Sequence, residues 1–152
     1  MKLNGFYKFQ ASKEQIFAAL LDPKQLEATI PACDSAWYSN TWGHIEVSIK
    51  TPVPGLEGPY VISVKVLEKH EPDMLVLSAG RNGTIGGKVN TVTRISLTDE
   101  ADGTMLTYET TAELSGPIAA ANNPLFQGIA KHSLKTFFKN LDASLVQGST
   151  VK

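Results

Sequence analysis

Residues 123–146, NPLFQGIAKHSLKTFFKNLDASLV, constrain the architecture more than any other part of the chain. Apolar side chains recur there at steps of three and four, the spacing of one face of an α-helix. The members of this stripe are Phe126, Ala130, Leu134, Phe137, Leu141 and Leu145. A helix of this length extends for about 35 Å at roughly 1.5 Å per residue. Only a broad sheet could cover a stripe of that length.

The same stretch predicts which face of the helix packs against the sheet. Phe137 falls in the centre of the stripe, and Phe138 falls toward its flank. The opposite face carries Lys131, Lys135 and Lys139 at four-residue intervals. The simpler interpretation of these lysines is a solvated face. The alternative is a contact with anionic lipid, which would contribute roughly 1 kcal/mol per lysine near such a surface.

Upstream, from about residue 36 to residue 114, the apolar period changes from helical to alternating. Ile45, Val47 and Ile49 point one way while their neighbours are polar, and similar rows occupy residues 60–66, 75–79, 89–97 and 106–114. Turn-forming residues separate the rows at 52–58, 71–73, 81–87 and 99–103. No long helix interrupts the series, so about six strands should pair as an antiparallel meander.

The start of the chain predicts one strand over residues 3–10 and two short helices. Ser12 and Gln15 have the spacing of a capping box. Asp22 and Pro23 have the form of an N-cap followed by proline at the first helical position. Pro31 should end this second helix.

Together these elements predict an α+β domain in which a curved antiparallel sheet of about seven strands wraps the long C-terminal helix. We expect one domain over residues 1–148 and a short tail over 149–152. One helix need not fill the space under a strongly curved sheet, and the gap would be an apolar pocket of the kind that binds small molecules. The side chains expected to line it are Leu26, Ile30, Tyr60, Ile62, Val64, Phe126, Ile129, Ala130 and Phe137.

Composition excludes several classes of function. The net charge is −1, and Arg81 and Arg94 are the arginines, which argues against nucleic-acid binding. Cys33 is the single cysteine, so neither an internal disulfide nor a cysteine metal site is expected. No stretch approaches the roughly 20 apolar residues that span a bilayer, and the first residues have no apolar signal region. A cytoplasmic protein is the simplest interpretation.

Residues that could carry chemistry are sparse. His44, His70 and His132 are far apart, which favours surface histidines over a metal site. We expect Cys33 to be a buried structural residue, because no base is placed to activate it. Residues 83–88 resemble a phosphate-binding loop, but Asn82 stands where the first glycine should be and the loop joins two strands. We therefore expect neither a metal nor a nucleotide, and no other cofactor.

Five stretches, in order along nearly the whole chain, carry a resemblance to a known family. They are Leu3-Asn4-Gly5 before the Ser12 helix start, residues 21–33 with Ile30-Pro31-Ala32-Cys33, residues 52–60 with Gly58-Pro59-Tyr60, the glycine-rich residues 80–87, and residues 102–138 from Asp102-Gly103-Thr104 to Phe137-Phe138. The sequence resembles the carbon monoxide dehydrogenase G-subunit family, within the START-like or SRPBCC superfamily.

The resemblance implies a helix-grip fold with a hydrophobic tunnel. It also implies an accessory role beside a molybdenum-containing dehydrogenase, with quinone handling or recruitment to the inner face of the membrane. The residues themselves leave three hypotheses open. The favoured one is a non-enzymatic binding protein or carrier for a lipid-like or quinone-like molecule. The others are a cyclase- or hydratase-type enzyme that uses the same cavity, and an interaction protein without a ligand.

The histidine spacing and the interrupted phosphate loop give a first testable prediction. Titration calorimetry with zinc or with ATP should detect no binding in the micromolar range. A micromolar affinity for either one would contradict this interpretation of the sequence.

Overall fold

The computed structural model describes residues 1–39, 44–50, 55, 57–81, 88–116 and 124–150, without the side chains of residues 125, 126 and 148–150. The order of elements is the predicted one: a strand, two short helices, six strands and a long helix. Their bounds are β1 (Lys2–Phe9), α1 (Lys13–Leu20), α2 (Pro23–Thr29), β2 (Cys33–Tyr38), β3 (Ile45–Ile49), β4 (Tyr60–His70), β5 (Met74–Arg81), β6 (Lys88–Glu100), β7 (Gly103–Ser115) and α3 (Pro124–Thr150).

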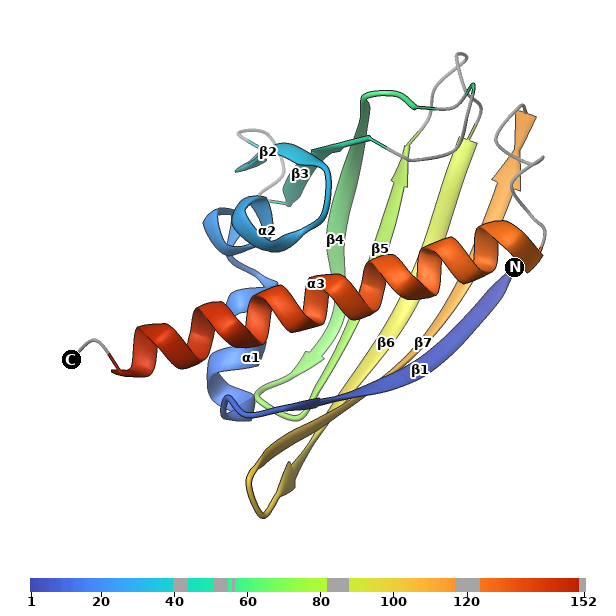
Figure 1. The fold of residues 1–152 in the computed structure, drawn as a ribbon. Coiled ribbons are helices and arrows are strands. Elements are labelled where there is room, and N and C mark those ends of the chain that lie inside the picture. The colour runs from blue at the N-terminus through green and yellow to red at the C-terminus, as the bar shows by residue number, and fades with distance from the viewer. Residues whose placement is uncertain (40–43, 51–54, 56, 82–87, 117–123, 151–152) are drawn as a thin grey trace.

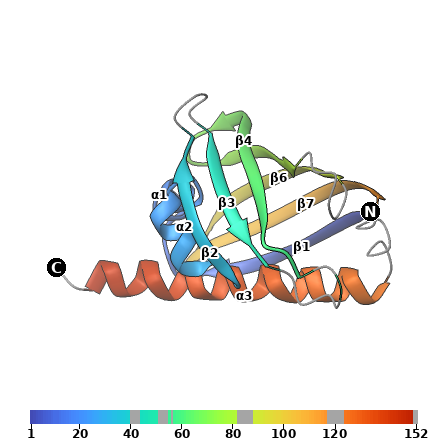
Figure 2. The same cartoon turned by 90° about the horizontal axis from the view of Figure 1, so that it is seen from above.

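Within the described residues, seven strands form one antiparallel sheet in the order β1-β7-β6-β5-β4-β3-β2. Strands β2 to β7 are therefore the expected meander, and β1 returns to pair with β7. The sheet curves around α3, which crosses its concave side (Figures 1 and 2). The predicted α+β class, a curved sheet around a long C-terminal helix, is confirmed.

Both short helices begin as the sequence predicts. The Ser12 hydroxyl accepts the Gln15 backbone N–H at 3.2 Å, and the Ser12 N–H donates to the Gln15 side chain at 3.1 Å. The Asp22 carboxylate accepts the N–H of Lys24 at 3.0 Å, and Pro23 occupies the first helical position. The two helices cover one end of the sheet (Figure 1).

Helix α3 is longer than the apolar stripe that predicted it. It continues to Thr150, four residues past the predicted end at Val146, and includes the start of the predicted tail. The stripe ends at Leu145, which packs against the core. Apolar periodicity marks only the part of a helix that packs, whereas backbone hydrogen bonding needs no such partner, so the sequence underestimated the length.

The densest packing lies under the C-terminal half of α3. The Phe138 ring lies 5.8 Å from the ring centroids of Phe9 and Tyr108, and 5.9 Å from that of Tyr7. Leu141, one turn further on, has no exposed surface. This half of the helix therefore closes the main core together with β1, β7 and α1.

A buried carboxylate fastens this half of α3 to the other end of the chain. Asp142 accepts the backbone N–H of Gln10 at 3.0 and 3.1 Å and that of Ala11 at 3.0 Å. Next to it, the Asn140 amide donates to the Thr29 carbonyl of α2 at 3.1 Å. The turn from β1 into α1 and the end of α2 are thus both tied to α3.

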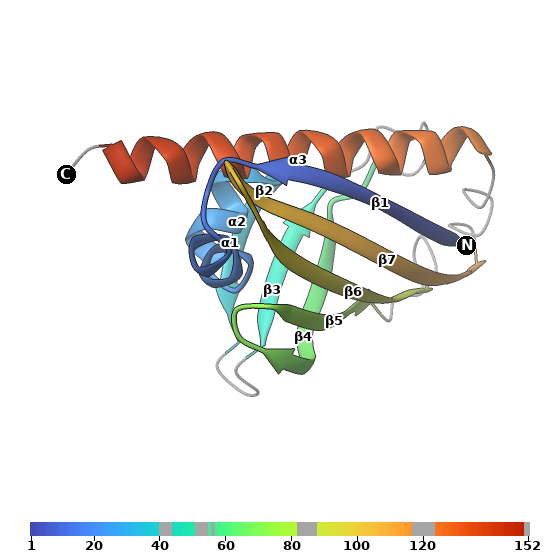
Figure 3. The ribbon, with the colours of Figure 1, turned by 90° about the horizontal axis from the view of Figure 1, so that it is seen from below.

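The two edges of the sheet differ. Strand β1 runs beside α3 (Figure 3). Strand β2, at the other edge, has a register shift between Cys33 and Ser35, and its Ala36 N–H donates to the Glu27 carboxylate of α2 at 2.9 Å.

The Asp142 contacts predict a large effect on stability. Asp142→Ala removes a charged acceptor from two backbone N–H groups, and we expect the free energy of unfolding to fall by about 2–3 kcal/mol. Asp142→Asn keeps one acceptor oxygen and should lose less. Denaturant melts measure both, with the exposed turn residue changed in Asp102→Ala as the control. Equal midpoints for the Asp142 and Asp102 variants would contradict the anchoring role.

Candidate ligand-binding cavity

A hollow of about 430 Å³ lies between the sheet and α3. Its walls come from strands β3 to β7, from α1 and α2, and from the first half of α3. Its wall includes short side chains, Ala79 on the sheet and Ala130 and Ser133 on the helix. One helix held at its C-terminal half does not fill the curve of the sheet, and the space left is the expected apolar pocket. We call it the inner cavity.

The structure places most of the predicted lining residues on this wall. The seven that it brings together are Leu26, Ile30, Ile62, Val64, Ile129, Ala130 and Phe137. Tyr60, in contrast, does not line the inner cavity. Its ring, at the start of β4, lies under the Arg81 guanidinium, whose central carbon is 4.7 Å from the centroid of the ring. The side chain of Phe126 lies outside the described residues. That these residues contact a ligand stays a prediction.

Sequence reasoning missed the part of the wall that the later strands supply. These residues include Leu77, Ala79, Thr93, Ile95, Tyr108 and Thr110. All belong to the alternating rows seen in the sequence, so their direction was predictable. Their position was not, because it depends on the register: Leu77 is opposite Thr93, and Thr93 is opposite Thr110.

The chemistry of the inner cavity is mostly that of aliphatic and aromatic side chains. The hydroxyls of Thr93 and Thr110 lie 2.9 Å apart and hydrogen-bond to each other. Lys50 and Tyr108 are the ionisable groups among the described residues of the wall, which include no carboxylate, imidazole or thiol. Burial raises the pKa of Tyr108, so its phenol is neutral at ordinary pH. The wall therefore offers contact area and a few neutral hydroxyls.

The rotation of α3 about its own axis, which decides the face that is buried, differs from the prediction. Phe138, expected on the flank, is only 3% exposed, whereas Phe137, expected at the centre, is half-buried and lines the inner cavity. The most buried face of the helix carries Phe138, Leu141 and Asp142. Counting apolar residues could not find this face, because Asp142 counts as polar and the adjacent phenylalanines are equally apolar.

The other candidate residues lie away from the inner cavity. His44 is not the surface residue expected: its side chain is 13% exposed and its Nε2 lies 3.0 Å from the Glu46 carboxylate, which also accepts the Ser63 hydroxyl. Cys33 is half-buried, and burial raises the pKa of its thiol, which disfavours the reactive thiolate. The described residues contain no group of three or more side chains that could hold a metal ion. Residues 82–87 of the glycine-rich loop lie outside the described part of the chain.

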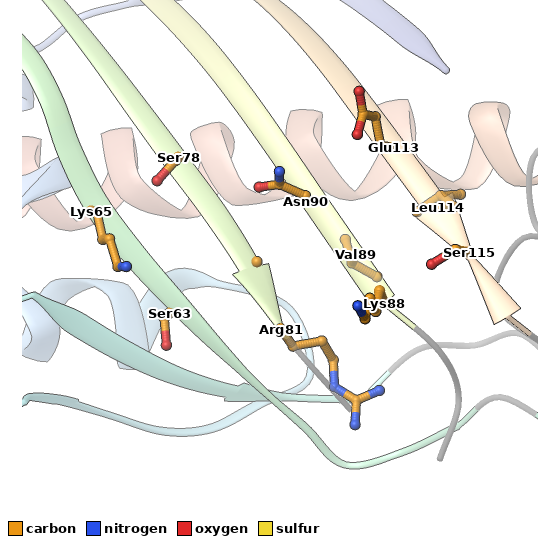
Figure 4. Close-up of a pocket in the computed structure, with 11 residues that line it drawn as sticks. Ser63, Lys65, Ser78, Arg81, Lys88, Val89, Asn90, Glu113, Leu114 and Ser115 are labelled. Carbon is orange, nitrogen blue, oxygen red and sulfur yellow. The ribbon is translucent and has the colours of Figure 1, made fainter. Parts of the chain in front are cut away.

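A second hollow, of about 530 Å³, has a different character. It lies on the face of the sheet turned away from α3 (Figure 4), with Lys65, Lys88 and Glu113 around a floor of short residues such as Ser78. Gly80 also lines this hollow, and a Cβ there would lie too close, 2.8 Å, to the Val89 carbonyl oxygen. This polar surface does not suit an apolar ligand.

In the part of the chain that the structure describes, no helix is both long and apolar enough to cross a membrane.

An antiparallel sheet that closes on a long C-terminal helix around an apolar cavity defines a START-like, helix-grip protein. Solved structures agree. A START superfamily protein from Mycobacterium smegmatis superposes with a TM-score of 0.70 at 16% identity, over 96% of this chain and 97% of that one. A conserved protein from Geobacillus kaustophilus superposes with a TM-score of 0.84 at 26% identity, over 97% and 96%.

The sequence also matches a family model. Residues 5–146 match the family of the carbon monoxide dehydrogenase G subunit (CoxG), and the chain belongs to this family. A third similar structure is the di-domain ARO/CYC StfQ from the steffimycin biosynthetic pathway, with a TM-score of 0.71 and 10% identity over 99% of this chain and 52% of that one. No curated protein matches the sequence.

The helical stripe, with Phe137 at its centre, would make the Phe137 ring the more important of the two for stability, and the observed burial reverses this order. Phe138→Ala should lower the free energy of unfolding by about 3–5 kcal/mol, because it removes the ring at the centre of the core. Phe137→Ala should cost less and should instead enlarge the inner cavity. Denaturant melts of the two variants compare them directly. A Phe137 variant that proves the less stable of the two would refute this assignment of the buried face.

Proposed function

We propose that the chain is a binding protein, a carrier or accessory protein, that holds a hydrophobic lipid-like or quinone-like molecule in the inner cavity. The observation that carries the proposal is the wall itself: aliphatic and aromatic side chains surround a space of about 430 Å³. Small-molecule sites are commonly apolar hollows of roughly 300–1,000 Å³ with few polar groups. Family membership and the START-like fold support the same role.

The scarcity of ionisable groups in the inner cavity favours binding over catalysis. General acid–base catalysis needs a side chain whose pKa lies near the working pH, within hydrogen-bond reach of the substrate. Lys50 and the neutral Tyr108 phenol are the titratable groups on the described wall. A cyclase- or hydratase-type activity is the second candidate. The fold that the chain shares with the di-domain ARO/CYC motivates it, although at 10% identity this likeness shows the fold alone.

The accessory role has its support in the family, whose description refers to carbon monoxide dehydrogenase. On this proposal the chain works beside a molybdenum-containing dehydrogenase in the cytoplasm. A contact of Lys131, Lys135 and Lys139 with anionic lipid at the inner face of the membrane is the alternative to a solvated helix face; all three are exposed on α3. Co-purification of the enzyme with the tagged chain tests the first contact, and flotation with anionic vesicles tests the second.

Filling the inner cavity gives a direct test. Ala130 lies on its wall and Ala143 is exposed further along the same helix, so Ala130→Phe and Ala143→Phe add the same side chain inside and outside the cavity. Native mass spectrometry of the gently purified parent should reveal a bound apolar molecule. Titration with the neutral fluorophore N-phenyl-1-naphthylamine should give an affinity that falls at least about tenfold in the Ala130 variant and is unchanged in the Ala143 variant, because only the first ring occupies ligand space.

Binding that is equally tight in the parent and in both variants would place the ligand elsewhere. A parent that carries no apolar molecule and binds no apolar probe would favour an interaction protein without a ligand. Turnover of a bound molecule into a product would favour the enzyme.

A further inference from the structure

A third hollow, of about 470 Å³, lies between β1 and α3, the two elements that run side by side in Figure 3. Residues 5–8 of β1 line one side and Lys131, His132 and Lys135 of α3 the other. Phe6 of the same strand is 72% exposed. We call this hollow the cationic groove.

The charge of the cationic groove has one sign. Lys8, Lys131 and Lys135 line it, and none of its described lining residues is acidic. The ion pairs found among the described residues involve Lys13, Lys69, His44 and His70, and none of the three lysines of the groove. Three lysines, with no carboxylate among the described lining residues, favour an anion.

The cationic groove and the inner cavity share a wall. Tyr108 and Phe138 line both hollows, and their ring centroids lie 5.8 Å apart. Gly5 faces Tyr108 across the β1–β7 pair, and a Cβ at Gly5 would lie 2.6 Å from the Tyr108 hydroxyl oxygen. The missing side chain at Gly5 therefore lets the Tyr108 ring reach the groove, and a single layer of aromatic rings separates the two spaces.

We infer that the ligand is an anionic amphiphile, whose carboxylate or phosphate head group lies in the cationic groove and whose apolar chain lies in the inner cavity. The Tyr108 and Phe138 rings are in contact in the structure, so they must move apart when the ligand enters. An apolar space next to a cationic one, with a thin side-chain partition between them, matches a molecule that has both characters. This inference rests on the proposed function and narrows it from apolar molecules in general to those with a negative head.

A pair of probes that differ only in the head group tests the inference. Dodecanoate and 1-dodecanol have the same chain length, and each can displace the neutral fluorophore N-phenyl-1-naphthylamine. The double variant Lys131→Gln with Lys135→Gln removes two charges from the groove. Lys139→Gln is the matched control, because Lys139 is exposed on the same helix and does not line the groove.

We expect the double variant to weaken dodecanoate binding by at least about tenfold. Dodecanol binding should not change, and the Lys139 variant should behave as the parent with both probes. Added salt should weaken dodecanoate binding to the parent more than to the double variant, because screening acts on the charges that the variant lacks.

The other outcomes are distinguishable. Binding of both probes that is insensitive to the lysines would overturn the inference and leave the proposed function standing. Failure of both probes to bind the parent would remove the proposed function as well. Flotation with vesicles of anionic phospholipid separates the two sources of a negative head group. A double variant that loses vesicle binding but keeps its dodecanoate affinity would assign these lysines to a membrane surface and overturn the inference.

Discussion

The capture of two backbone N–H groups by the Asp142 carboxylate fixes where the long helix lies on the sheet. The donors, Gln10 and Ala11, stand where the chain leaves β1 and approaches α1, so one side chain joins the first and last elements of the fold. A buried carboxylate is unfavourable unless it is hydrogen-bonded, and each bond it accepts restricts its position. The helix is therefore held by a directional contact as well as by apolar packing.

Because of this anchoring, the two halves of α3 have different structural roles. The C-terminal half supplies Phe138 and Leu141 to a filled core, while the N-terminal half passes over the inner cavity with Ile129 and Ala130 on its wall. An unfilled apolar space forgoes the dispersion contacts that a packed core would make. Any molecule that binds the folded state and not the unfolded chain adds stability that grows with the logarithm of its concentration divided by its dissociation constant. Core packing and the cavity wall are thus supplied mainly by different turns of one helix, and Phe138 lies at the boundary and belongs to both.

The features that the sequence could predict are those that depend on residues close together in the chain. The caps at Ser12 and Asp22 depend on residues two or three positions away, and both were predicted correctly. The cavity wall from β5 to β7 depends on register between strands, which no local pattern contains. The errors have the same origin. The centre of the buried face of α3 was misplaced because Asp142 looks like a surface residue until its distant donors are known. Tyr60 was misplaced because Arg81 lies on another strand, and His44 because the Glu46 carboxylate beside it also accepts the hydroxyl of Ser63 on β4.

The structure of the edge strand β2 affects the tendency of the protein to aggregate. A sheet edge offers a row of unsatisfied donors and acceptors onto which a strand from another chain can add, which is the usual start of aggregation. Here the Glu27 carboxylate already occupies the Ala36 N–H, and the irregular register at Cys33 and Ser35 interrupts the regular spacing that an added strand would need. The contact between α2 and β2 is therefore also a defence against uncontrolled polymerisation, located at the edge that α3 does not flank.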